Sequence, residues 1–300
     1  MTTTRKGRAA SAISVDHLKR LTILGLFSDD TLADLLVLKG GNALSLVYEL
    51  GHRGSLDLDF SMEADFPPEL LTSLEARIAE ALNKSFAPEG LVAFDLTLDE
   101  VPQEVTPDMA PFWGGYVITF KLITAQEHLG ANGDLDRMRR RALVTGPGQI
   151  KKVQVEISKH EFCTPREIRE LDGLRVSVYS PAMIVCEKLR AICQQTESYS
   201  RLVRRTPRAR ARDFYDIYST MQRFYLDFGS EETRALLRDI FQAKRVPLEL
   251  LSQMEETRTF HAPDFDAVRG TVPLGTDLKS FDFYFDFVLK VCKGLMPLGK

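Results

Sequence analysis

Apolar residues recur at two spacings along the chain, and these spacings predict its helices and strands. Helical spacing predicts helices over residues 14–26, 28–38 and 67–86, the second of which opens with a Ser/Asp cap. Strict alternation predicts strands over 91–101, 115–124, 150–158 and 174–178. After residue 180 the spacing is almost entirely helical, over 181–198, 208–228, 231–244, 247–257 and 277–294. The pattern predicts an α+β fold, with a mixed β-sheet in residues 1–180 followed by a mostly α-helical C-terminal domain, residues 181–300.

The segment 277–294 is also compatible with a strand. Its phenylalanines occupy every second position, at Phe281, Phe283, Phe285 and Phe287. Three polar residues, however, recur four positions apart and form one stripe of a helix: Asp282, Asp286 and Lys290. This polar stripe favours a helix.

One stretch near the N-terminus combines a turn, a short helix and a strand. A glycine pair, Gly40–Gly41, follows the apolar run 35–38, and a short amphipathic helix follows the glycines. Residues 56–60 then alternate, so Asp57 and Asp59 face one side of a strand and the apolar residues face the other. The pattern predicts two carboxylates that face a cleft, one short helix away from a glycine turn.

These two features suit a site for a metal ion and a phosphate. Two close carboxylates repel unless a cation lies between them, and Mg²⁺ binds one or two carboxylates together with substrate phosphates. A glycine turn at a helix start presents backbone N–H groups to an anion. Taken singly, Asp57-x-Asp59 is more often a solvated strand edge and Gly40–Gly41 an ordinary turn. Their order and spacing favour the combined site.

A second group of charged residues lies in the predicted helical domain. Lys188 is in the middle of the helix that begins at Ser180-Pro181, and Asp213 and Asp216 share one face of the following helix. An exposed ion pair between Lys188 and Asp213 is the alternative interpretation, and such a pair contributes at most about 1 kcal/mol. Beside Asp57 and Asp59, a role in the same site is favoured.

Three further features leave alternatives open. The tract 198–212 has arginines and no acid, so it is either a solvated loop or a surface for a phosphate backbone: Arg201, Arg204, Arg205, Arg208, Arg210 and Arg212. A second basic group is either a solvated helix face or an RNA-facing patch: Arg137, Arg139, Arg140 and Arg141. Glu156 alternates onto the polar face of a strand, as charged residues often do.

Composition narrows the class of protein. The net charge is −3, so any nucleic-acid surface is local, and no apolar run is long enough to span a membrane. The N-terminus lacks the apolar segment of a secretory signal, and the four cysteines have no Cys-x-x-Cys spacing, which favours buried thiols in a cytoplasmic protein. There is neither a P-loop motif nor zinc-site spacing among the five histidines.

The motif Lys39-Gly-Gly-x-Ala-Leu44, followed by Arg53-x-Ser-x-Asp-x-Asp-Phe60, resembles the first motif of the AbiEii/AbiGii-type nucleotidyltransferase toxins. Lys188 with Arg212-Asp-x-x-Asp216 resembles their downstream motif. These toxins form one half of type IV toxin–antitoxin and phage abortive-infection systems and belong to the DNA polymerase β-like nucleotidyltransferase superfamily. The motif departs from the family at Asn42, where Thr or another small residue is common.

The resemblance implies a metal-dependent nucleotidyltransferase of α/β type that uses Mg²⁺ (or Mn²⁺) and an NTP substrate. It implies four catalytic residues, Asp57, Asp59, Lys188 and Asp213, and metal ligation by Asp57, Asp59 and Glu156. Nucleotide binding would involve Lys39, Gly40, Gly41, Arg53, Ser55 and Lys188. Arg212 and Asp216 would join the two helices by ion pairs. Relatives of this class modify tRNA 3′ ends and block translation, so tRNA is the implied acceptor, and an antitoxin is the implied partner.

Two other functions remain open at this point. The first is transfer to a small molecule, such as an aminoglycoside, or to a protein hydroxyl; the basic tract that includes Arg201, Arg204, Arg205, Arg208 and Arg210 argues against a cationic acceptor. The second is an inactive fold that only binds nucleotide, RNA or a partner protein. The presence of Asp57, Asp59, Lys188 and Asp213 together argues against this second function.

Overall fold

A seven-stranded mixed sheet forms the centre of the protein. The structure, a computed structural model, describes residues 13–50, 58–272 and 275–295. The strands run in the order β3-β4-β5-β2-β1-β7-β6. Their bounds are β1 Val37–Lys39, β2 Leu58–Ser61, β3 Leu91–Val101, β4 Gly115–Thr124, β5 Val153–Ser158, β6 Glu167–Leu171 and β7 Leu174–Val178. The pairs β1–β7 and β2–β5 are parallel, and the other neighbours are antiparallel. The sheet is therefore mixed, as predicted.

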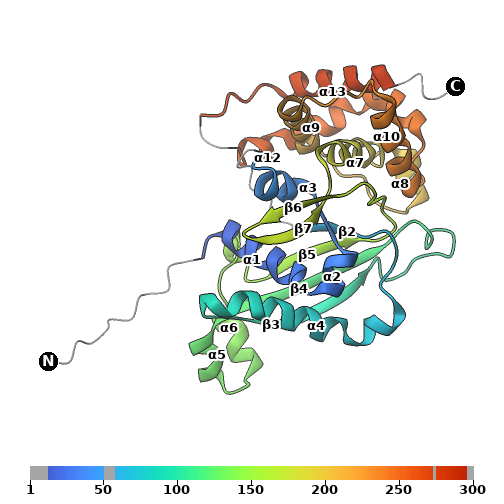
Figure 1. The fold of residues 1–300 in the computed structure, drawn as a ribbon. Helices are drawn as coiled ribbons and strands as arrows, with labels where there is room; N and C mark the ends of the chain where they lie inside the picture. Colours follow the sequence, from blue (N-terminus) through green and yellow to red (C-terminus); the bar gives the residue numbers. More distant parts are fainter. Residues whose placement is uncertain (1–12, 51–57, 273–274, 296–300) are drawn as a thin grey trace.

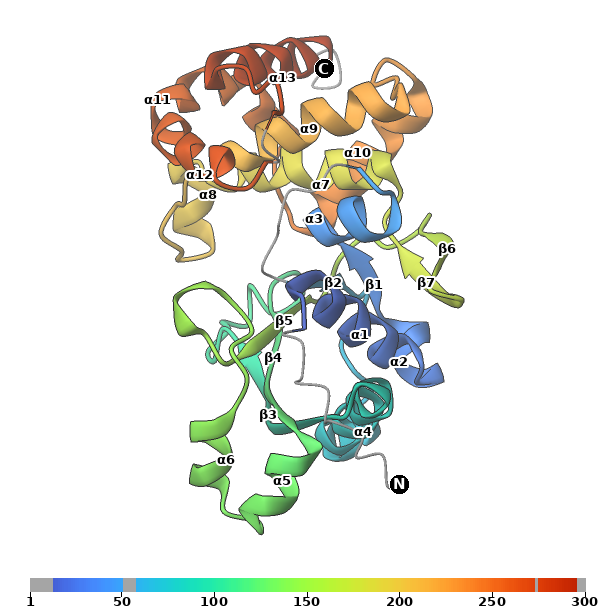
Figure 2. The same cartoon turned by 90° about the vertical axis from the view of Figure 1, so that its left-hand side faces the viewer.

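Helices from the first half of the chain cover one face of this sheet (Figure 1). They are α1 (Val15–Phe27), α2 (Asp30–Leu35) and α4 (Pro68–Phe86), and α1 packs against α4. Two short helices, α5 (Ala125–Ala131) and α6 (Leu135–Arg141), project beyond β3 and β4 (Figure 2). They pack against these strands through a small, separate apolar cluster. After β1, α3 (Gly40–Asn42) continues as a π-helical segment, Ala43–Val47.

From residue 181 onward the described chain is helical and lies as a layer beside the sheet, next to α3 (Figure 2). The helix α7 packs against both α9 and α10 at the centre of this layer. The bounds are α7 Pro181–Cys193, α8 Glu197–Leu202, α9 Ala211–Phe224, α10 Glu231–Ala243, α11 Arg258–His261, α12 Asp266–Arg269 and α13 Phe281–Leu295, with a 3₁₀ helix over Leu248–Thr257. None of the described helices combines the length and the apolar character needed to cross a membrane.

The alternation of the sequence decides which strand faces are buried. In β4 the buried side chains include Tyr116, Ile118 and Phe120, whereas the residues between them are partly exposed. In β5, Val155 and Ile157 are buried and Glu156 is exposed. Since side chains on a strand alternate between its faces, the polar residues of neighbouring strands collect on one face. The predicted strands over 91–101, 115–124 and 174–178 match the observed bounds, and the predicted fold class is confirmed.

The helix predicted over 28–38 is wrong in its second half. Asp29 caps α2 by accepting a hydrogen bond from the Leu32 N–H (3.0 Å), as the Ser/Asp signal indicated, but the helix ends at Leu35. Residues Val37–Lys39 form β1, between β2 and β7. A central strand is apolar on both faces, so the run Leu36–Leu38 has no alternation that distinguishes it from a buried helix.

Other elements differ from the prediction in smaller ways. The strand β6 was not predicted because it is an edge strand with mostly exposed side chains. The arginine group of residues 137–141 lies on α6, which is separated from α5 at Asn132 and Gly133, both of which have positive φ. The segment 181–198 is also divided, into α7 and α8, and the helix over 247–257 is of the 3₁₀ type. The helix over 277–294 is confirmed as α13.

All four cysteines are free and buried, as expected: Cys163, Cys186, Cys193 and Cys292. Burial raises the pKa of the Cys163 and Cys186 thiols above their ordinary value. They are therefore small apolar groups of the core. The division into two domains at residue 180 stays a prediction.

Truncation of Phe60 tests the packing that supports the strand after Asp59. Phe60 is fully buried, and its ring centroid lies 6.0 Å from that of Phe27. Phe60→Ala should lower the free energy of unfolding by about 3–5 kcal/mol in a urea titration, because the cavity cannot fully collapse. The control is Leu129→Ala on α5, where the side chain is 75% exposed and the change should be within about 0.5 kcal/mol. Equal losses in both variants would contradict this assignment of the core.

Candidate active site

The sheet register places three charged residues side by side at one end of the sheet. Lys39 on β1 pairs in register with Asp59 on β2, and Asp59 pairs with Glu156 on β5. Partners in register point to the same face of a sheet. All three line a cleft with a volume of about 1170 Å³ between the sheet and the C-terminal helices. Three predicted site residues, Arg53, Ser55 and Asp57, lie outside the described residues.

The glycine turn approaches the Asp59 carboxylate very closely. Gly40 has a φ of +69°, and a Cβ at this position would lie 2.8 Å from Asp59 Oδ2. Both the backbone conformation and the contact therefore require glycine here. Gly40 and Gly41 both line the cleft. The predicted glycine turn thus lies directly against the predicted carboxylate.

A buried carboxylate, Glu161, holds three cations at the base of the cleft. Arg190 donates two hydrogen bonds to it, at 2.6 Å to Oε2 and 3.2 Å to Oε1. The Nζ atoms of Lys39 and Lys244 lie 3.5 Å and 3.6 Å from Oε1. Arg190 is on α7 and Lys244 follows α10, so this cluster joins the end of β1 to the helical layer. The sequence analysis did not identify Glu161, Arg190 or Lys244, since no local motif connects residues so far apart.

The cluster shifts the titration of its members. Burial would raise the pKa of Glu161, but Arg190, Lys244 and Lys39 outweigh it and hold that pKa far below its usual range. Burial would lower the pKa of Lys39, but Glu161 and Glu187 raise it. For Lys244, burial and the neighbouring cations outweigh Glu161 and lower its pKa to about 8. Three cations thus share a single fully buried anion, and the charged form of Lys244 is the least stabilised of the three.

Lys188 lies in a second buried ion cluster, between α7 and α9. Its Nζ donates to Asp213 Oδ1 and to Asp216 Oδ2, each at 2.8 Å. The other carboxylate oxygen of Asp213 accepts a hydrogen bond from the Arg210 guanidinium. All three members of the Lys188 group are buried, so the exposed ion pair considered from sequence is wrong. Asp216 joins the two helices as expected, whereas Arg212 lines the cleft and pairs with no described carboxylate.

The environment of Asp213 makes it a weak base. Burial would raise the pKa of this carboxyl, but Arg210 and Lys188 lower it well below its usual range. A carboxylate with a strongly lowered pKa accepts a proton poorly at neutral pH. The geometry therefore favours a role in which Asp213 holds Lys188 and Arg210 in place over one in which it accepts a proton.

His261 supports the start of α9 from the other side. Its Nδ1 accepts a hydrogen bond from the Arg210 backbone N–H (3.0 Å), and its ring packs against Phe214 at 5.3 Å between centroids. Burial lowers its pKa to about 4, so the ring is neutral at pH 7. This contact fixes the end of the arginine tract. The positions of the five histidines in the sequence form no motif, so this contact between His261 and Arg210 was not predicted.

The two arginine-rich segments have different surroundings. Five of the six arginines of the tract 198–212 line the cleft: Arg204, Arg205, Arg208, Arg210 and Arg212. The sixth, Arg201, is exposed and forms an ion pair with Glu197 on its own helix. On α6, Arg139 pairs with Asp95 and lowers the pKa of that carboxyl to about 2, while Arg141 pairs with Glu127. The α6 arginines do not line the cleft.

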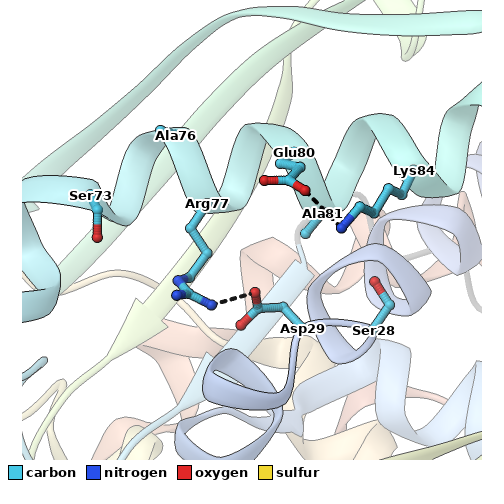
Figure 3. Close-up of a pocket in the computed structure, with 8 residues that line it drawn as sticks. All are labelled: Ser28, Asp29, Ser73, Ala76, Arg77, Glu80, Ala81 and Lys84. Carbon is cyan, nitrogen blue, oxygen red and sulfur yellow. Dashed lines mark hydrogen bonds and ion pairs between the residues drawn. The ribbon is translucent and has the colours of Figure 1, made fainter.

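A second depression, between α4 and the turn that joins α1 to α2, has no comparable chemistry (Figure 3). Its charged residues pair with one another, Arg77 with Asp29 at 2.7 Å and Lys84 with Glu80 at 2.8 Å. Asp29 also caps α2. The Arg77–Asp29 pair joins α4 to the start of α2, and the Lys84–Glu80 pair lies within α4, so these charges are already paired with one another.

Comparison with known proteins identifies the family to which this chain belongs. The family described as "Nucleotidyl transferase AbiEii toxin, Type IV TA system" matches residues 22–287. The chain belongs to this family of nucleotidyltransferase toxins, which confirms the resemblance stated above. A type IV toxin–antitoxin family implies an antitoxin as partner. No curated protein matches the chain.

Solved structures of low identity are also similar. JHP933 from Helicobacter pylori has 18% identity and a TM-score of 0.45, with 94% of this chain and 90% of that chain covered. A second Helicobacter pylori structure has the same identity and TM-score, with 95% and 94% covered. An antigenic nucleotidyltransferase-like protein from Paracoccidioides brasiliensis has 17% identity and a TM-score of 0.37, with 87% and 96% covered.

Substitution of Gly40 tests the close approach to Asp59. Gly40→Ala adds left-handed strain of about 1–2 kcal/mol and also displaces the Asp59 carboxylate. The control is Gly133→Ala, which has a φ of +81° and no atom within 4 Å of the added Cβ, so it carries the strain alone. Urea unfolding should show a greater loss for Gly40→Ala than for Gly133→Ala. Equal losses would mean that the contact with Asp59 has no energetic consequence.

Neutralisation of Glu161 tests the cation cluster. Glu161→Gln leaves buried cations without their anion and should lower the free energy of unfolding by about 3–5 kcal/mol at pH 7. The folded-state pKa of Glu161 is lowered, so its contribution is complete above the ordinary glutamate pKa and declines as the pH falls below about 4.3. The difference between wild type and variant, followed by urea unfolding from pH 7 to pH 3, should therefore shrink.

The control for this substitution is Glu127→Gln, which breaks a partly exposed pair with Arg141. It should cost no more than about 1 kcal/mol. A loss for Glu161→Gln that stays constant down to pH 3 would contradict the assignment of the buried anion.

Proposed function

We propose that this toxin transfers a nucleoside monophosphate from an NTP to an RNA hydroxyl, at the 3′ end of tRNA. The hydroxyl oxygen attacks the α-phosphorus, the bond to the β-phosphate oxygen breaks, pyrophosphate leaves, and the hydroxyl proton is lost to water. The observation that carries the proposal is the cleft, which brings together the glycine turn, the carboxylates of Asp59 and Glu156, and the arginine segment 204–210. A nucleotide site and a polyanion surface thus share one cavity.

The carboxylates suit a divalent cation. Asp59 and Glu156 are register partners on one face and supply hard oxygen ligands, of which Mg²⁺ in a nucleotide site needs only one or two. Within the described part of the chain, no three acidic, histidine or cysteine side chains form a metal site by themselves, and Asp57 lies outside that part. Mg²⁺ or Mn²⁺ held there with Asp57 would neutralise charge on the phosphates and on the leaving group.

The lysines have distinct roles in this proposal. Lys39 is held by Ser158 Oγ (3.2 Å) and by Glu161, next to the glycine turn, and suits the phosphates of the NTP. Lys188 is held by Asp213 and Asp216, and its cluster fixes Arg210 at the cleft wall. Phosphoryl transfer depends mainly on positioning and on stabilisation of charge, which fixed cations provide without rearrangement.

The charge of the cleft favours a polyanionic acceptor over a cationic small molecule. Among the described lining residues, lysines and arginines outnumber aspartates and glutamates. Arg204, Arg205 and Arg208 form no ion pair with a described carboxylate, so their charge is available to a phosphate backbone. Two alternatives are transfer to a protein hydroxyl and binding of nucleotide without any transfer. The assay below distinguishes both from transfer to tRNA.

Replacement of Asp59 tests the reaction. Wild-type protein with Mg²⁺, each α-labelled NTP in turn and total tRNA should transfer label to tRNA, and chelation of the metal should abolish transfer. Asp59→Asn keeps the shape of the side chain but removes its charge, and we expect at least about a hundredfold lower rate. The control is Asp136→Asn, on an exposed aspartate of α6, which should retain wild-type activity.

Each result of this assay has a distinct meaning. Label on tRNA with wild type only identifies the reaction and the preferred nucleotide. Equal labelling by Asp59→Asn would refute the proposed site. NTP that binds without being consumed would favour a binding module, and consumption with no label on tRNA would point to another acceptor.

A further inference from the structure

The only tryptophan of the chain lies at the wall of the cleft. Trp113 ends the segment between β3 and β4 and is partly exposed, with its backbone N–H donating to Met109 O (2.9 Å). Its ring packs against that of Tyr199 on α8, at 6.4 Å between centroids. The indole therefore has a fixed position on the side of the cleft that faces the arginine segment.

Two cations flank this ring. The Arg205 guanidinium carbon and the Lys244 Nζ each lie 5.7 Å from the ring centroid. Lys244 is held in place because its Nζ donates to Lys159 O (2.5 Å) and its own carbonyl accepts from the Tyr199 hydroxyl (2.6 Å). Three different parts of the chain, the 102–114 segment, the arginine tract and the end of α10, thus converge on one aromatic ring.

The positive charge around the ring is only partly balanced by acids. Arg205 forms no ion pair with any described carboxylate, and Lys244 shares Glu161 with Arg190 and Lys39. Arg208 and Arg210 place like charges beside the exposed Arg205, and burial together with Arg190 and Lys39 lowers the pKa of Lys244. An anion bound beside Arg205 and Lys244 would offset the repulsion that each receives from its cationic neighbours.

We propose that Trp113, Arg205 and Lys244 form a subsite for one nucleotide unit of a single-stranded RNA acceptor, with a base on the indole and its phosphate at the two cations. Aromatic rings beside cations bind single strands in this way, because every base has a face that stacks and every unit has a phosphate. The subsite rests on the proposed function, for which it names the part of the cleft that holds the acceptor. The NTP phosphates would lie at Lys39, Gly40 and Asp59, next to this subsite, because Lys39 and Lys244 both contact Glu161 Oε1.

The fluorescence of the single tryptophan provides a direct test. A short single-stranded RNA with a free 3′ hydroxyl, added to the full chain without NTP, should quench the emission saturably, as a stacked base does. Tripolyphosphate carries charge but no base and should quench little. Quenching by tripolyphosphate equal to that by RNA would refute stacking. Quenching by ATP alone equal to that by RNA would assign the subsite to the incoming nucleotide and overturn its assignment to the acceptor.

Variants then separate stacking from packing. In anisotropy titrations of end-labelled RNA, Trp113→Phe should keep most of the affinity, whereas Trp113→Leu should bind about tenfold or more weakly. Arg205→Gln should lower the slope of log affinity against log salt concentration by about one, as loss of one phosphate contact does. Arg201→Gln is the matched control, because Arg201 is in the same tract but pairs with Glu197 and does not line the cleft.

Unchanged RNA binding by Trp113→Leu, together with an unchanged salt slope for Arg205→Gln, would overturn the subsite. Circular dichroism and melting temperature verify that the variants are folded, and Arg205 is exposed, so its substitution leaves the core intact. The titrations need no turnover. If the wild type shows the predicted quenching but transfers no nucleotide, the proposed function alone is refuted. If the wild type transfers nucleotides and the Trp113→Leu variant binds RNA as tightly as the wild type, the subsite alone is refuted.

Discussion

The register of three neighbouring strands is the constraint on which the site depends. Lys39, Asp59 and Glu156 come from β1, β2 and β5, and only the pairing of these strands places them in one row. A slip by one residue would turn each side chain to the opposite face and bury the charges in the core. Phe60 resists such a slip, because its fully buried ring fixes the face to which its neighbour Asp59 points. Apolar packing on one face of the sheet thus determines the chemistry of the other.

Ion clusters then determine the shape of the cleft. Glu161 joins the end of β1 to α7 and α10, and Lys188 joins α7 to α9, so both clusters meet on α7. Buried ion pairs contribute little net stability, since the loss of hydration offsets most of their attraction. Their hydrogen bonds nevertheless have preferred directions. Removal of one partner leaves an uncompensated buried charge and strongly lowers the free energy of unfolding. We infer that the Glu161 cluster fixes the helical layer against the sheet, whereas the Lys188 cluster fixes α7 against α9 within that layer.

The sequence predicted what depends on local pattern and missed what depends on distant contacts. The alternation in β4 and the glycine pair at the start of α3 are local, and the structure contains both. The strand β1 was assigned to a helix because a strand buried on both faces has no alternation. Glu161 and His261 have no surrounding motif, and only the folded chain shows that one binds three cations and the other the backbone of Arg210. Lys188 was found by resemblance, but its burial between two carboxylates was not predictable from spacing.

The distribution of counter-charges divides the cations of the cleft into two groups with different physical properties. Lys39 and Lys188 have buried carboxylates as partners, so their positions are fixed before any ligand arrives. Fixed charges of this kind stabilise a transition state without the cost of reorganisation. Arg204, Arg205 and Arg208, in contrast, are exposed and form no ion pair with a described carboxylate. Such charges attract a polyanion at a distance and release counterions when it binds. The first group therefore suits the precise placement of a small substrate, and the second suits the capture of a large, negatively charged one.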